Sequence, residues 1–143
     1  MTTQEIIIEI NKLIIQSLDD LGALERIDKL TNLLRVNGDG YLACEHLIYL
    51  LERHPNVEFG TPGEPVHTLE TFQGYYEVFL YQSLERQPTQ MTVWMLNRII
   101  NAEANIEKKN ELLNRLGNCL NHPSANEVAK EATLNFLKYQ TEE

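Results

Sequence analysis

The stretch from Pro88 to Asn101, PTQMTVWMLNRIIN, constrains the fold of this chain most strongly. Proline is favoured in the first turn of a helix and threonine caps free backbone N–H groups, so Pro88 and Thr89 predict a helix start. Apolar side chains then cover nearly every side of the predicted helix, and such a helix is normally surrounded by other helices. Asn97 and Arg98 therefore need partners, because a buried polar group without one costs about 1–3 kcal/mol.

The other apolar residues recur at helical spacing in segments that glycine, proline and asparagine interrupt. Capping-box patterns at Thr2–Glu5 and Ser124–Glu127 predict two helix starts, and the acidic pair Asp19–Asp20 predicts another. The helices predicted in this way cover residues 3–17, 19–36, 41–54, 66–72, 75–87, 88–101, 106–121 and 124–140.

This pattern predicts an all-α fold, with one domain over residues 1–143 and seven or eight helices. Grouped as antiparallel pairs, the helices span residues 3–36, 40–73, 75–101 and 104–140. The pairs repeat roughly every 34 to 37 residues, a period typical of helical-hairpin repeats. We therefore expect a short HEAT-like α-solenoid, with an irregular helical bundle as the alternative.

The acidic residues are concentrated in the middle of the chain. The net charge is −9, and residues 37–87 hold eight acids against Arg53 and Arg86, a local net charge of −6. Such a field repels nucleic acid and phospholipid surfaces and attracts basic proteins. We therefore expect a basic protein partner, with neither nucleic acid nor membrane. No apolar run approaches the length of a membrane span and no signal peptide is recognisable, so a cytoplasmic location is expected.

No motif in the sequence indicates an enzyme, a cofactor or a metal. Cys44 and Cys119 lack metal-ligand or redox spacing and are interpreted as buried thiols. The loop 37–40 resembles a calcium loop, but its first and last ligand positions would be Arg35 and His46. The remaining catalytic alternative is His67 with Glu70, three residues apart, for which a structural role is favoured.

A candidate partner surface combines acids with tyrosines, since aromatic anchors with charged surroundings are typical of protein interfaces. A purely structural alternative is also open for Glu70 and Glu77, as ion-pair partners of Arg98 or Arg86. The candidate partner-binding residues are Glu58, Glu64, Glu70, Tyr75, Tyr76, Glu77, Tyr81 and Glu85.

Two blocks of the sequence, 59–72 with the run FGTPGEPVH at its start and 88–101 quoted above, carry a family resemblance. The chain resembles HEAT-like all-helical immunity proteins of bacterial polymorphic toxin and contact-dependent growth inhibition systems. Glu64 departs from the pattern, where a small residue or proline is expected. The resemblance offers no catalytic motif. It implies that the protein neutralises a toxin domain, often a nuclease, by binding it.

Two functional hypotheses follow. In the first, the chain is an immunity protein that binds a basic toxin domain through its acidic surface. In the second, it is a helical-repeat adaptor for some other protein partner.

Overall fold

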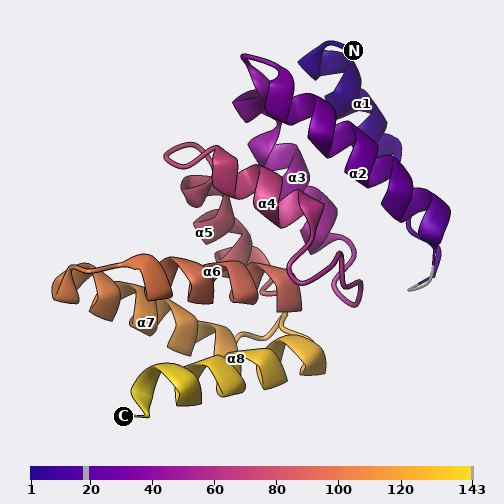
Figure 1. Ribbon diagram of the computed structural model, residues 1–143. Coiled ribbons are helices and arrows are strands. Elements are labelled where there is room, and N and C mark those ends of the chain that lie inside the picture. Colours follow the sequence, from indigo (N-terminus) through magenta and orange to yellow (C-terminus); the bar gives the residue numbers. More distant parts are fainter. Residues whose placement is uncertain (18–19, 143) are drawn as a thin grey trace.

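Eight α-helices and one short 3₁₀ helix form the structure, a computed structural model that describes residues 1–17 and 20–142 (Figure 1). The described residues contain no strand, and the all-α prediction is confirmed. The elements are α1 (Thr3–Lys12), α2 (Leu21–Val36), η1 (Gly40–Ala43), α3 (Cys44–Glu52), α4 (Glu64–Thr71), α5 (Glu77–Arg86), α6 (Gln90–Ala102), α7 (Ile106–Leu120) and α8 (Glu127–Thr141).

Helices of successive pairs lie side by side. α1 packs against α3, α3 against α5, α2 against α4 and α6 against α8. α3 and α5 run in the same direction, because the rings of Tyr41 and Tyr75 stack at their N-terminal ends and Ser83 donates to Glu52 near their C-terminal ends. This neighbour pattern is the one that stacked helical hairpins produce.

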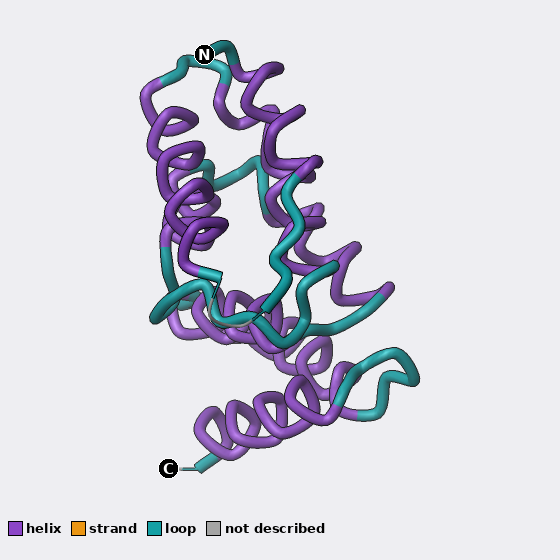
Figure 2. The backbone as a smooth tube through the Cα atoms, turned by 90° about the vertical axis from the view of Figure 1, so that its right-hand side faces the viewer, coloured by secondary structure: helices purple, strands orange, loops and turns teal. Residues whose placement is uncertain are grey.

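The stack of helical pairs is interrupted between α1–α5 and α6–α8. α4 makes little contact with α6, and α5 makes little contact with α7, whereas α3 packs against α6. Helices α6, α7 and α8 consequently form a separate layer that crosses the end of the first five (Figures 1 and 2). A continuous HEAT-like solenoid is therefore not confirmed, although the helical pairs are present.

Helix α6 lies at the centre of the fold, as its apolar sequence predicts. It packs against α3, α5, α7 and α8, and Met91, Val93, Met95, Leu96 and Ile100 are all buried. The hydroxyl of Thr89 caps the helix by accepting from the backbone N–H of Thr92. The two polar residues of this helix also find partners: Asn97 accepts from Gln140 at 2.8 Å, and Arg98 pairs with Glu70.

Helix α1 is shorter than predicted, because it ends at Lys12 instead of continuing to residue 17. Arg53 donates to the carbonyl of Ile10 at 2.7 Å, and the backbone N–H of Ile15 donates to His54 Nε2 at 3.2 Å. These tertiary hydrogen bonds satisfy backbone groups that another helical turn would have paired. Ile14, an apolar residue of the predicted helix 3–17, is 71% exposed.

Two predicted caps have different outcomes. Asp20 caps α2 by accepting from the backbone N–H of Ala23, while Asp19 lies outside the described residues. The Ser124 capping box is wrong: α8 is capped by Asn126, whose side chain accepts from the backbone N–H of Ala129. The Ser124 N–H instead donates to a ring nitrogen of His122.

Candidate functional site

The interruption in the helix stack opens a cleft between the two halves of the molecule. Its volume is 540 Å³, and its walls come from α4, α5, α6 and α7 with the turns beside them. The candidate residues that line it are Glu70, Tyr76, Glu77 and Tyr81. Four of the eight residues proposed from the sequence are therefore brought together here.

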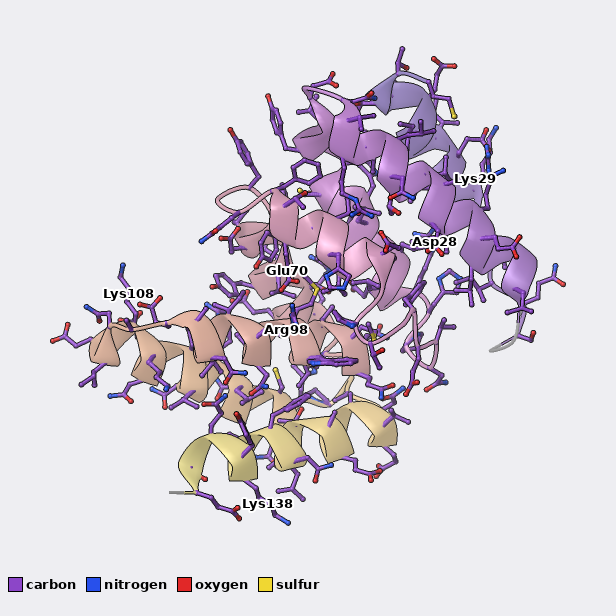
Figure 3. The ribbon with its side chains drawn as sticks, viewed as in Figure 1. Asp28, Lys29, Glu70, Arg98, Lys108 and Lys138 are labelled. Carbon is purple, nitrogen blue, oxygen red and sulfur yellow. The ribbon has the colours of Figure 1, made fainter. Side chains whose placement is uncertain are left out.

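Two ion pairs join the helices around the cleft. Glu70 on α4 accepts two hydrogen bonds from Arg98 on α6, at 2.8 and 2.9 Å, and the two side chains point toward one another in Figure 3. This carboxylate raises the pKa of the Arg98 guanidinium. Arg115 on α7 lies 3.2 Å from Glu85 on α5 and 4.4 Å above the Tyr81 ring. Both arginines are thus engaged within the protein.

Two tyrosines that line the cleft, Tyr76 and Tyr81, lie close to the carboxylate of Glu77. Tyr76 is 5% exposed, and burial followed by the nearby Glu77 carboxylate raises its pKa. The pKa of Tyr81 is raised for the same two reasons, in the same order. Glu77 stands beside them and accepts from the backbone N–H of Gly74 at 2.9 Å. The tyrosines therefore remain neutral hydroxyls at physiological pH.

The other proposed residues do not lie in this cleft. Glu58 accepts from the side chain of Gln90, and Glu64 pairs with Arg35 on α2. Tyr75 is 52% exposed and stacks on Tyr41, with ring centroids 4.4 Å apart. Glu85 borders a neighbouring hollow. The eight residues therefore lie on several separate surfaces, although they are close together in the sequence.

Sequence reasoning missed a second feature, an exposed apolar group at the N-terminal ends of α3 and α5. Tyr41 and Tyr75 form its stack. Leu42 follows Tyr41 in sequence and Val78 lies three residues after Tyr75, and they are 55% and 53% exposed. We call these four residues the aromatic patch. Tyr41, the first residue of the predicted helix 41–54, is only half-buried. The signal that could have found the patch is the apolar pair directly after Gly40, because adjacent residues of a helical turn point in different directions and cannot both face the core.

The acidic residues of segment 37–87 are partly neutralised by arginines in the folded structure. Four of its eight acids form ion pairs, and three of those pairs use arginines from outside the segment. The pairs are Glu52–Arg86, Glu64–Arg35, Glu70–Arg98 and Glu85–Arg115. Among the described residues, the segment's acids with no cation within ion-pair distance are Asp39, Glu45, Glu58 and Glu77.

Three of the histidines make structural hydrogen bonds. His54 bridges the Leu50 carbonyl and the Ile15 N–H, and His122 bridges the Glu85 carbonyl and the Ser124 N–H. His46 bonds to the side chain of Asn11. His67 is exposed, and its Nδ1 lies 3.9 Å from Glu70, too far for a hydrogen bond.

Both cysteines are buried and unpaired, as predicted. Desolvation raises the pKa of Cys44 to about 12 and that of Cys119 to about 11. Within residues 1–17 and 20–142, no three His, Cys, Asp or Glu side chains are grouped so as to hold a metal ion. None of the helices in that part of the chain has the length and apolar character of a membrane span.

Comparison with known proteins gives no relative: no family model, no curated protein and no solved structure matches the chain.

Proposed function

We propose that this protein is an immunity protein that binds and neutralises a bacterial toxin domain, a basic nuclease. The observation that carries the proposal is the aromatic patch and its acidic surroundings. Asp39 and Glu45 flank Tyr41 in sequence, and Glu77 follows Tyr75 by two residues. None of the three acids lies within ion-pair distance of a cation in the described residues. Exposed aromatic side chains bordered by unneutralised acids are suited to a basic protein partner.

The overall charge supports the same partner class. A net charge of −9 attracts a basic domain over a distance of about 8 Å at physiological ionic strength and speeds the encounter. A nuclease carries a basic cleft for the phosphates of its substrate, so an acidic protein is complementary to it. The family resemblance of residues 59–72 and 88–101 points to the same role.

The distribution of ion pairs favours the adaptor alternative. Half of the acids in residues 37–87 are neutralised by arginines, so the surface field of this segment is weaker than its sequence suggests. A helical-repeat adaptor needs exposed aromatic anchors but no strong field. The two functions therefore differ in how strongly binding depends on salt.

Co-expression tests the role directly. A toxin domain encoded beside this chain should kill cells alone and should be tolerated when the chain is present. The neighbouring toxin and the chain should also be recovered as a complex. Survival that does not improve, together with no complex, contradicts the immunity role.

Substitutions at the aromatic patch test the surface. We expect Tyr75→Ala and Glu45→Lys each to weaken toxin binding, about tenfold or more for an aromatic anchor that contributes over 1 kcal/mol. Glu25→Lys on α2 is the control for the charge reversal, because Glu25 is exposed and has no cation within ion-pair distance among the described residues. Equal affinity of all three variants would refute this surface. Variants of Glu64 and Glu70 are less informative, because they also break internal ion pairs.

A further inference from the structure

The cleft between α4, α5, α6 and α7 contains a polar group that the fold itself does not use. Tyr76 is 5% exposed, so its ring belongs to the core, yet it also lines the cleft. Its hydroxyl makes no hydrogen bond to any described residue. It is not one of the buried polar atoms without a partner in the described residues, so it reaches the solvent of the cleft, whereas the hydroxyls of buried tyrosines usually bond within the protein. The ring of Tyr76 is therefore fixed by packing, while its hydroxyl remains free for a ligand.

The charges around this hydroxyl favour a cation. Three carboxylates that line the cleft, Glu77, Glu103 and Glu111, have no cation within ion-pair distance. Two of the three cations in the lining, Arg98 and Arg115, are held by Glu70 and Glu85. The third, Lys108, lies at the α6–α7 end of the opening (Figure 3).

The chemistry of the lining groups further narrows the class of ligand. Glu77 and Glu103 present carboxylate oxygens, which accept hydrogen bonds from ammonium or guanidinium groups. The neutral Tyr76 hydroxyl offers lone pairs to the same donors. A volume of 540 Å³ is within the range of ligand sites and exceeds what one side chain needs, so the ligand can enter attached to a peptide backbone.

We propose that this cleft is a subsite for a basic side chain, an arginine or lysine that the protein partner inserts between the two helix layers. The Tyr76 hydroxyl and the Glu77 carboxylate hold its charged end, and Glu103 completes the acidic wall. The inference rests on the proposed function in so far as it assumes a protein partner, and it adds a second anchor point next to the aromatic patch. Because the site belongs to the free protein, it can be tested without the toxin.

The test is an NMR titration of the ¹⁵N-labelled protein with three short capped peptides. Their sequences are Gly-Arg-Gly, Gly-Lys-Gly and Gly-citrulline-Gly, all acetylated and amidated, at constant ionic strength. We expect saturable shifts confined to the backbone amides around Tyr76, Glu77 and residues 98–115 with the arginine or lysine peptide. Citrulline has nearly the shape of arginine without its charge and should leave these amides unchanged.

Two variants identify the groups that bind. Tyr76→Phe and Glu77→Gln should each weaken peptide binding about threefold to tenfold, the effect of one hydrogen bond. Tyr76→Phe should melt at the temperature of the wild type, since the hydroxyl has no partner to lose. Glu25→Gln, on the distant helix α2, is the control and should bind the peptides as the wild type does.

Three outcomes overturn the proposal: no saturable shifts, equal shifts with citrulline, or shifts over all acidic surfaces that Glu25→Gln reduces as much as Glu77→Gln. None of these outcomes bears on whether the protein binds a toxin domain. Conversely, a chain that binds the basic peptides but gives no protection in co-expression retains the subsite and loses the immunity role.

Discussion

Gly40 shows how one residue fixes the junction between α2 and η1. A Cβ atom at this position would lie 2.1 Å from the carbonyl oxygen of Leu34 and 3.0 Å from the ring of Phe72. The first of these contacts is with backbone, which cannot move without shifting α2. Only glycine allows the two segments to come this close.

We expect Gly40→Ala to lower the free energy of unfolding by about 1–3 kcal/mol, the usual cost of overpacking. Gly117→Ala is the matched control. Gly117 lies inside α7, and a Cβ there meets nothing within 4 Å. It should therefore raise stability by about 0.5–1 kcal/mol through helix propensity. Urea denaturation of both variants measures the difference, and a Gly40→Ala protein as stable as the wild type would contradict the packing described.

The buried thiols make stability depend on alkaline pH. An unfolded cysteine ionises near its ordinary pKa of 9.0, whereas burial raises the folded pKa of Cys44 to about 12 and of Cys119 to about 11. The folded state therefore retains protons that the unfolded state loses. Their stabilising contribution is complete below pH 9 and is lost as pH rises through about 11 for Cys119 and about 12 for Cys44.

Above pH 9, we expect each thiol to lower the free energy of unfolding by up to about 1.4 kcal/mol per pH unit. Denaturation at pH 8.5, 9.5 and 10.5 under reducing conditions measures this slope. Replacing Cys119 with alanine should make the slope shallower, since one of the two thiols is then absent. A slope that is the same in both proteins would show that the Cys119 thiol does not titrate on unfolding.

At the level of helices, the Glu70–Arg98 pair joins the two layers on either side of the cleft. The pair is bidentate, and its side chains are 25% and 37% exposed. It therefore has better geometry and less solvent than an ordinary surface ion pair. The Glu127–Lys130 pair provides a contrast within α8, with a 3.7 Å separation and a glutamate side chain that is 93% exposed.

A double-mutant cycle on Glu70→Gln and Arg98→Gln should give a coupling free energy of about 1 kcal/mol, the upper end for pairs near a surface. The same cycle on Glu127 and Lys130 should give about 0.3 kcal/mol or less. Chemical denaturation of the single and double variants provides both values. Equal coupling in the two cycles would mean that the interlayer pair contributes no more than a solvated one.

At the scale of the whole molecule, the helices and the central place of α6 could be predicted from local sequence. Apolar spacing and caps such as Thr2, Asp20 and Thr89 act within one or two turns, so they are readable along the chain. The early end of α1 could not be predicted, because Arg53 and His54, directly after α3, replace its last helical hydrogen bonds.

The candidate site was only partly predictable for the same reason. Sequence placed the acids in one segment, but folding brings Arg35, Arg98 and Arg115 from other segments to three of them. Charge along the chain is therefore a poor guide to charge on the surface. The cleft itself depends on the sparse contact between α5 and α7, which no local pattern records.

The proposed role predicts that electrostatic attraction contributes to binding between the whole molecule and its partner. The measurement that tests it most directly is a calorimetric titration of this protein into the purified toxin domain encoded beside it, at low and high salt. We expect a 1:1 complex that abolishes toxin activity, with affinity that falls as salt rises because complementary charges are screened. No heat of binding and full toxin activity at equimolar protein would contradict the account.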